Sequence, residues 1–206
     1  MHKKVISLAP VATLLLAGPA LAAEHAGRNF TYLDVNYSYN TYSDYSEAFG
    51  GITDIEGSGY GFEASYGFTD EFHGFFNWNT QDLNFPADIE FTTVGLGLSK
   101  HLSPRADFYL RGGYVSVSAD FANGAHNNDS GQAWDLGFRG ELVPRWEMEV
   151  SMKYMNVEEF IDDTSFHWGT RFSVTDMIGL NLGADFSNEQ TSYSAGFRVN
   201  FGKYGH

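Results

Sequence analysis

Apolar and polar residues alternate strictly along the last part of the chain, from Thr191 to Phe201. One set of alternate positions is aromatic or aliphatic: Tyr193, Ala195, Phe197, Val199 and Phe201. The other set is polar or glycine: Ser194, Gly196, Arg198 and Asn200. A period of two over this length predicts a β-strand with two different faces. An apolar outward face and a polar inward face are typical of a strand in a lipid-embedded barrel.

The same alternation recurs in nine earlier segments, so we expect about ten strands of the length that crosses a bilayer at a tilt. These strands are expected near 31–39, 60–68, 73–78, 94–99, 108–114, 134–142, 146–154, 166–174 and 180–186. Turns after even-numbered strands are short and carry Thr-Asp or Pro-Arg pairs. Connections after odd-numbered strands are mostly longer and acidic, at 40–57, 81–88, 121–129 and 158–164. The pattern predicts an all-β, transmembrane, antiparallel up-and-down β-barrel with short periplasmic turns and longer extracellular loops. An eight-stranded barrel would require one alternating run to be a loop.

A soluble sandwich or lipocalin-like barrel would show the same alternation, with its apolar face inside and its polar face outside. Three features favour lipid outside. Glycine and charge share the polar face, bulky aromatic residues gather near many strand ends, and the chain begins with an export signal.

That signal is a short basic start, Lys3 and Lys4, followed by an apolar run from Val5 to Ala17. Ala20 and Ala22 then form the small-x-small pattern of a cleavage site. The run is shorter than the roughly 20 apolar residues of a membrane-spanning helix and contains Pro10. We therefore expect residues 1–22 to be a cleaved signal peptide, and residues 23–206 to form a single outer-membrane β-barrel domain.

Composition is compatible with this architecture and argues against one class of partner. Aromatic residues make up 17% of the chain, glycines number 23, and cysteine is absent. A mean hydropathy of -0.28 suits a soluble protein, but also a barrel whose every second residue faces a polar interior. The formal charge is -14, and becomes about -16 once Lys3 and Lys4 are removed with the signal. Such an acidic chain without a basic stripe is not expected to bind nucleic acid.

Charges of both signs occupy positions that face the predicted lumen: Asp34, Glu63, Arg111, Asp135, Arg139, Glu149, Lys153, His167, Arg171, Asp185 and Arg198. The four arginines are expected at one depth with Asp34, Glu63 and Glu149. Asp135, Lys153, His167 and Asp185 are expected one level higher. Charges inside a narrow barrel should pair, because an unpaired buried charge is costly. The set is then either a salt-bridged plug or the selectivity ring of a narrow pore. The small diameter expected of such a barrel favours the plug.

The sequence gives weaker support to a catalytic site or a metal site. Asp162, Asp163 and His167, or His126 with Asp129, are the best candidates for activating a water molecule, but neither set matches a known motif. Neither G-x-S-x-G nor H-E-x-x-H occurs, so we expect no catalytic residues and no cofactor. Acidic residues in two loops offer oxygen ligands for Ca²⁺ or Mg²⁺: Asp44, Glu47, Asp54 and Glu56, and Glu158, Glu159, Asp162 and Asp163. Neither loop has the EF-hand order, and a solvated surface explains both. We expect no metal site, and leave an extracellular ligand at these loops as a hypothesis.

The final strand also resembles a known signal. Ser194, Gly196, Val199 and Phe201 are similar to the C-terminal assembly signal of bacterial outer-membrane barrels, although five residues follow Phe201 here. With the strand layout, the chain resembles the opacity/OmpA-like superfamily of small outer-membrane barrels, and within it a ten-stranded gammaproteobacterial group. The resemblance implies the bacterial outer membrane as location, outer-membrane lipid as surroundings, and insertion by the barrel-assembly machinery. Members of the superfamily act in adhesion, structural support or narrow channels, so the resemblance selects no single role.

Overall fold

The computed structural model describes residues 30–42, 55–84, 87–122, 124–157, 161–188 and 190–201. These residues form ten β-strands: β1 (Tyr32–Tyr42), β2 (Ile55–Gly67), β3 (Phe72–Leu83), β4 (Ala87–Ser103), β5 (Ala106–Phe121), β6 (His126–Val143), β7 (Trp146–Val157), β8 (Ile161–Ser173), β9 (Ile178–Phe186) and β10 (Gln190–Asn200). No helix among the described residues is long and apolar enough to span a membrane. The predicted signal peptide lies outside the described residues.

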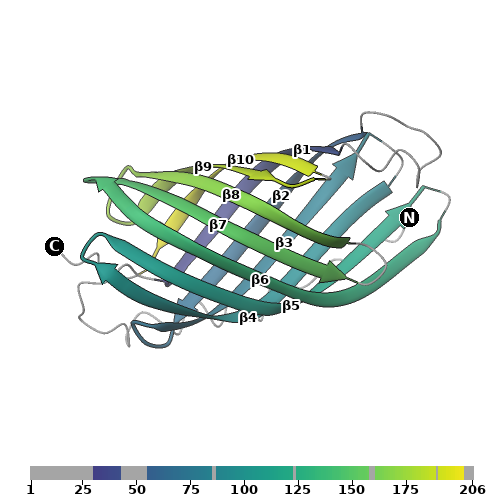
Figure 1. The fold of residues 1–206 in the computed structure, drawn as a ribbon. Helices are drawn as coiled ribbons and strands as arrows, with labels where there is room; N and C mark the ends of the chain where they lie inside the picture. The colour runs from purple at the N-terminus through teal and green to yellow at the C-terminus, as the bar shows by residue number, and fades with distance from the viewer. Residues whose placement is uncertain are drawn as a thin grey trace.

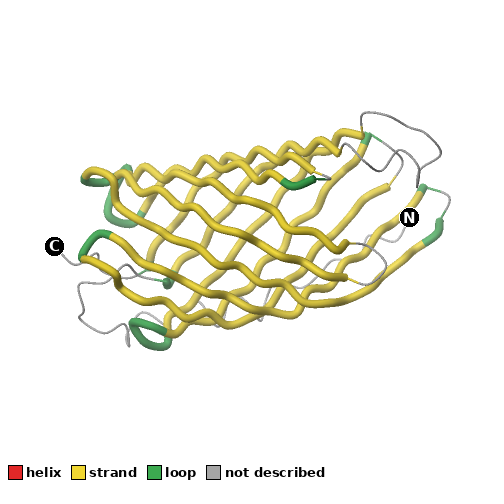
Figure 2. Tube along the Cα trace, in the orientation of Figure 1, coloured by secondary structure: helices red, strands yellow, loops and turns green. Residues whose placement is uncertain are grey.

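The strands close into one antiparallel barrel in which each strand pairs with its neighbours in sequence (Figure 1). Closure is made by β1 and β10, which pair from Tyr32 with Asn200 to Tyr42 with Gln190. The connections 68–71, 104–105, 144–145 and 174–177 gather at one end, the left end in Figure 2, which we call the turn end. The other end is the loop end. The predicted ten-stranded, all-β up-and-down barrel is confirmed.

The outer surface of the barrel carries a band of large apolar side chains. Val94, Leu96 and Leu98 on β4 are 53–56% exposed, and Leu180 and Leu182 on β9 are 55–58% exposed. The same band continues around other strands with Tyr114, Leu136, Phe138, Met152, Trp168, Phe172, Tyr193 and Phe197. A continuous apolar band of this kind is unfavourable in water and favourable in the hydrocarbon region of a bilayer. The soluble alternative, which hides the apolar face inside, is therefore excluded.

Several strands run further toward the loop end than the alternation predicted. β4, β5 and β6 contain 17, 16 and 18 residues, more than the roughly 9–11 that a tilted crossing needs. Much of the predicted connections 81–88, 121–129 and 158–164 is strand, which leaves only 84–86, 122–125 and 158–160 between strands. The physical reason is that antiparallel ladder bonds join backbone groups, so pairing continues where side chains are polar on the outward face.

The polarity of the two faces reverses in these extensions. Beyond the apolar band, the outward positions of β4 are Asp88, Glu90 and Thr92. On β5, the inward Val115 and Val117 are fully buried and belong to an apolar cluster inside the barrel. The segment above the band thus has the pattern of a water-soluble sheet, with polar residues outside and apolar residues inside. The reversal marks where the membrane ends.

The position of the apolar band predicts which outward side chains lie deep in the membrane, and arginine substitutions test this prediction. Leu182→Arg, in the middle of β9, places a charge in hydrocarbon and should destabilise the folded barrel by about 2–4 kcal/mol. Val174→Arg, in the turn after β8, should cost at most about 1 kcal/mol because an interfacial charge remains hydrated. Urea unfolding of both variants in lipid vesicles measures the difference. Equal costs would contradict the proposed position of the bilayer.

Candidate functional site

The turn half of the barrel interior is filled by a layer of charged and aromatic side chains. This lumen layer consists of Phe30, Tyr32, Asp34, Glu63, His73, Asp107, Tyr109, Arg111, Arg139, Glu147, Glu149, Arg171 and Arg198. Phe30, Tyr32 and Tyr109 form an apolar core within it and are at most 4% exposed. Alternation directs the strand residues of the layer inward, and closure of the barrel brings them together.

Arg111 on β5 reaches across the lumen to the opposite wall. Its Nη1 donates to Glu63 Oε1 at 3.0 Å, and its Nη2 donates to the Tyr32 hydroxyl at 2.6 Å. Tyr32 in turn donates to Glu63 Oε1 at 2.5 Å. The Arg111 Nε also donates to His73 Nε2 at 3.2 Å. One guanidinium therefore connects β5 with β1, β2 and β3.

A second group of contacts spans the seam where the barrel closes. Arg198 on β10 donates from Nε to Asp34 Oδ2 on β1 at 2.8 Å, and its Nη2 contacts the same oxygen. The guanidinium carbon of Arg198 lies 3.6 Å from the centre of the Tyr32 ring. Asn181 on β9 donates to Asp34 Oδ1 at 2.7 Å. Asp34 thus uses both carboxylate oxygens to hold three strands together.

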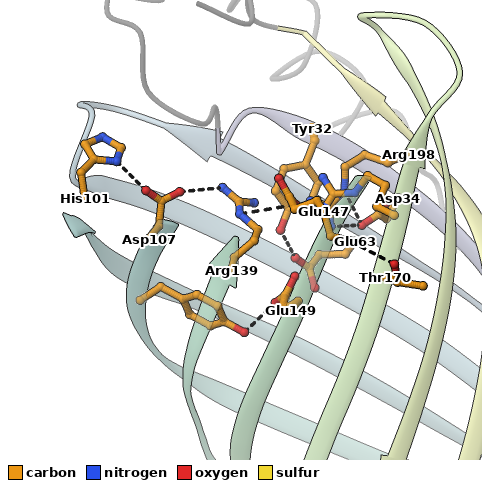
Figure 3. Close-up of polar contacts among 12 residues, drawn as sticks. Tyr32, Asp34, Glu63, His101, Asp107, Arg139, Glu147, Glu149, Thr170 and Arg198 are labelled. Carbon is orange, nitrogen blue, oxygen red and sulfur yellow. Dashed lines mark hydrogen bonds and ion pairs between the residues drawn. The ribbon is translucent and has the colours of Figure 1, made fainter. Parts of the chain in front are cut away.

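A third group runs along the turn end, and Figure 3 shows it from His101 through Asp107 and Arg139 to Glu147. The His101 Nδ1 lies 2.5 Å from Asp107 Oδ1. Arg139 Nη2 lies 3.8 Å from Asp107 Oδ2, and Arg139 Nε lies 3.7 Å from Glu147 Oε1. Arg171 on β8 donates to Glu147 Oε1 at 2.7 Å. Glu147 is therefore bracketed by two arginines from the strands on either side of it.

Phe30 covers the lumen layer on the side of the turn end. It precedes β1, is 4% exposed, and stacks on His73 with the ring centres 4.2 Å apart. The guanidinium carbon of Arg139 lies 4.2 Å from the centre of the Phe30 ring, a favourable cation–π geometry. One aromatic ring thus covers two cationic or imidazole groups at the turn end.

The remaining predicted charges lie toward the loop end. Lys153 Nζ donates to Asp185 Oδ1 at 2.8 Å, and His167 Nδ1 contacts the same oxygen at 2.9 Å. Asp135, however, is the cross-strand partner of Arg111, so the two share a rung instead of lying one level apart as expected. The stagger between strands in a tilted barrel explains the error, because counting from the turns ignores it. The structure brings all eleven predicted charges into the lumen.

Several members of the lumen layer were not predicted. Asp107 lies four residues before Arg111 and Glu147 lies two residues before Glu149, both on inward positions, so the period of two could have identified them. Tyr32 also lies on the polar face of its strand. Phe30 carried no signal, because it precedes the first strand and only the closed barrel places it in the lumen.

Glycines make room for the layer at two close approaches. A Cβ added to Gly97 would lie 2.2 Å from His73 Nε2, and one added to Gly137 would lie 2.6 Å from the Tyr109 hydroxyl. Tyr109 needs that space because it donates to Glu149 Oε1 at 2.6 Å. Glycine on the polar face is therefore a packing requirement of the layer.

Above the layer lies a cavity of about 440 Å³. Its apolar wall carries Phe91, Ala133, Met155 and Ile161, and the polar part of its lining carries Asn36, Ser38, Asn40, Asn77, Asn79 and Gln81. The apolar wall belongs to the polarity reversal of the long strands, with Val115, Val117 and Val157 fully buried behind it. The sequence did not predict this wall, because Phe91, Ala133 and Met155 lie outside the predicted strands and Ile161 lies in the predicted connection 158–164.

The other sequence candidates do not assemble into a catalytic or metal site in the described part of the chain. Asp162 accepts from the Tyr154 hydroxyl at 3.0 Å, whereas His167 contacts Asp185, and His126 contacts Asp120 at 2.6 Å. Among the described residues, no group of three or more His, Cys, Asp or Glu side chains is arranged to hold a metal ion. Asp44, Glu47, Asp54, Glu158 and Glu159 lie outside the described residues.

The residues of the predicted assembly signal lie on the closing strand. Ser194 and Gly196 are on the inward face of β10, and a Cβ at Gly196 would lie 2.1 Å from the carbonyl oxygen of Val35. Phe201 follows β10, and its backbone nitrogen donates to the Thr31 carbonyl at 3.0 Å. These contacts belong to the seam between the first and last strands.

Comparisons with known proteins identify the fold. No family model and no curated protein matches the chain. The β domain of the Bordetella autotransporter BrkA is similar, with a TM-score of 0.50 and 13% identity over 82% of this chain and 98% of that one. The KdgM porin (TM-score 0.47, 8% identity, 82% and 99% covered) and Neisserial surface protein A (0.44, 14%, 82% and 96%) are further similar structures. None of these three is described as an enzyme. Ten antiparallel strands around a charged interior, with an apolar outer band, are the architecture of outer-membrane barrels.

The close approach at Gly137 generates a stability test. Gly137→Ala should destabilise the barrel by about 1–3 kcal/mol, because the new methyl group overlaps Tyr109 and Ser151. Gly140→Ala is the matched control on the same strand, where the nearest atom, the Arg105 carbonyl oxygen, is 3.4 Å away. Its cost should stay within about 0.5 kcal/mol. Denaturant titration followed by tryptophan fluorescence measures both, and equal midpoints would contradict the packing described.

A row of three carboxylates crosses the loop end above the membrane. Asp88 pairs in register with Asp82 on one side and with Asp120 on the other. Partial burial, together with the charges of Asp82 and Asp120, raises the pKa of Asp88 above its ordinary value. A raised carboxyl pKa means that the folded state binds the proton more tightly, so stability falls as the pH rises through that pKa.

Asp88→Asn should therefore stabilise the barrel by a few tenths of a kcal/mol at pH 7, where all three carboxylates repel. The gain should vanish near pH 3, where the wild-type carboxyl is protonated. Thermal unfolding at both pH values measures the effect. A gain of the same size at both would show that charge repulsion is not its cause.

Proposed function

We propose that this chain is an outer-membrane barrel whose lumen layer blocks passage of solutes, and that it acts as a structural or surface-interaction protein. The observation that carries the proposal is the burial of the layer across the lumen. Tyr32, Tyr109 and Arg139 are 1–2% exposed, and His73 is fully buried. Side chains packed this closely support a lumen without a continuous aqueous path.

The bonding within the layer supports a structural role. Arg171 and Arg198 each contact a carboxylate on the neighbouring strand, and Arg111 on β5 contacts Glu63 on the non-adjacent β2, so the layer joins both neighbouring and separate strands of the wall. A selectivity ring, in contrast, needs charges that face a water-filled path. Barrel-assembly machinery and outer-membrane lipid are the partners that such a protein requires, and a surface ligand would meet it at the loop end.

A narrow porin-like channel is the second candidate. It is favoured by the cavity of about 440 Å³ in the loop half of the lumen, which would become one vestibule of a pore. Such a pore would require rearrangement of the lumen layer, because Phe30 and Arg139 lie across the turn end.

Planar-bilayer recording separates the two candidates. We expect the refolded wild-type barrel, verified by heat-modified migration on gels, to show no conductance steps. Steady steps with a preference for cations or anions would contradict the closed barrel and establish the channel.

Replacement of Arg111 provides an independent test. Arg111→Met removes the partner of Glu63 and should destabilise the barrel by about 3–5 kcal/mol. Lys100→Met is the matched control, because Lys100 is an exposed cation on the outward face of β4. If Arg111→Met instead leaves the unfolding midpoint unchanged and alters ion preference, the layer is a selectivity filter.

A further inference from the structure

The cavity above the lumen layer has the size of a small-molecule site. Its volume of about 440 Å³ falls within the roughly 300–1,000 Å³ of protein sites for small ligands. The lumen layer forms its floor, so what enters from the loop end does not pass through. The inference that follows rests on the proposed closed barrel.

The two walls of the cavity differ in chemistry. The apolar wall presents an aromatic face, Phe91, and the flexible side chain of Met155, which pack against the buried Val117 and its neighbours. The polar part of the lining presents amides and hydroxyls. Of these, Asn36, Ser192 and Ser194 make no side-chain hydrogen bond within the described residues and are available to a ligand.

The charge of the lining selects the sign of a ligand. Seven carboxylates and four cationic side chains line the cavity, which gives a formal charge of -3 with His167 neutral. The cationic groups are already bound to carboxylates, as in the contact of Lys153 with Asp185 at 2.8 Å. The excess negative charge, enclosed by low-dielectric walls, attracts cations and repels anions.

Two of the carboxylates that line the cavity lie near Met155, at different depths. Asp163 on β8 pairs in register with Met155, and Asp135 pairs with Lys153 one inward position nearer the floor. Carboxylates at two depths beside the apolar side chain of Met155 match a chain of methylenes that carries ammonium groups. A bare metal ion fits less well, because no metal-binding group of three ligands occurs among the described residues and one wall is apolar.

We propose that the cavity binds a short aliphatic diamine or polyamine. One ammonium group contacts Asp163, the methylene chain lies against Met155 and Ile161, and a deeper ammonium group lies toward Asp135. Phe91 contributes a ring face to a cation, and the free amides and hydroxyls accept the remaining N–H groups.

Isothermal titration calorimetry of the full barrel in phosphatidylcholine nanodiscs tests the proposal, with putrescine and spermidine as probes. We expect saturable binding that is tighter for spermidine, which carries more positive charge. Asp163→Asn should weaken spermidine binding about tenfold, as loss of a charged hydrogen bond does. Asp162→Asn, the adjacent carboxylate on the outward face, is the matched control and should change binding less than twofold.

Phe91→Leu is a second variant that keeps the wall apolar and should weaken binding roughly two- to fivefold through loss of the ring face. Three outcomes overturn the proposal: no heat with either amine, equal weakening by Asp162→Asn and Asp163→Asn, or equal affinity for magnesium chloride at matched ionic strength. Tighter binding of maltose or galacturonate would also overturn it. None of these outcomes bears on conductance, so failure of the amine site and failure of the closed barrel are distinguishable.

Discussion

Charges inside this barrel must be paired inside the barrel, because the wall around them is embedded in lipid. A charge in such a place has only its neighbours and trapped water to replace bulk solvation. Arg111, Arg171 and Arg198 meet that constraint by reaching to carboxylates on other strands. The same contacts join strands of the wall, so the pairing of buried charges also stabilises the closed barrel. The glycines at Gly97 and Gly137 belong to it, since larger residues would occupy the space of His73 and Tyr109.

The barrel is surrounded partly by lipid and partly by water, and the polarity of the outward and inward faces of its strands reverses at the boundary. In the membrane, Leu96 and Leu98 face outward and charges face inward. Toward the loop end of the same strand, Asp88 faces outward and Phe91 packs inside against Val117. In the membrane the apolar face of the strand is turned toward lipid, and beyond the membrane it is turned toward the apolar interior of the barrel. The reversal places an apolar wall inside an otherwise polar lumen, and this wall gives the cavity its mixed character.

The proposed functions rest on the two halves of the lumen. The turn half is filled and bonded, which suits support and closure of the membrane. The loop half is hollow, bears excess negative charge, and has one apolar side. The proposed binding of a diamine or polyamine uses the loop half alone, and the proposed closure of the lumen uses the turn half.

The sequence by itself determined the strand number, the outward and inward faces, and the inward placement of all eleven charges from Asp34 to Arg198. A period of two is a local property, and each strand expresses it without help from the others. The tertiary structure decided which charges meet, because the stagger between tilted strands sets the level of each side chain. It placed Asp135 opposite Arg111, brought Phe30 under the layer, and extended β4, β5 and β6 beyond the membrane. These outcomes depend on contacts between residues far apart in the chain, and only the closed barrel brings such residues together.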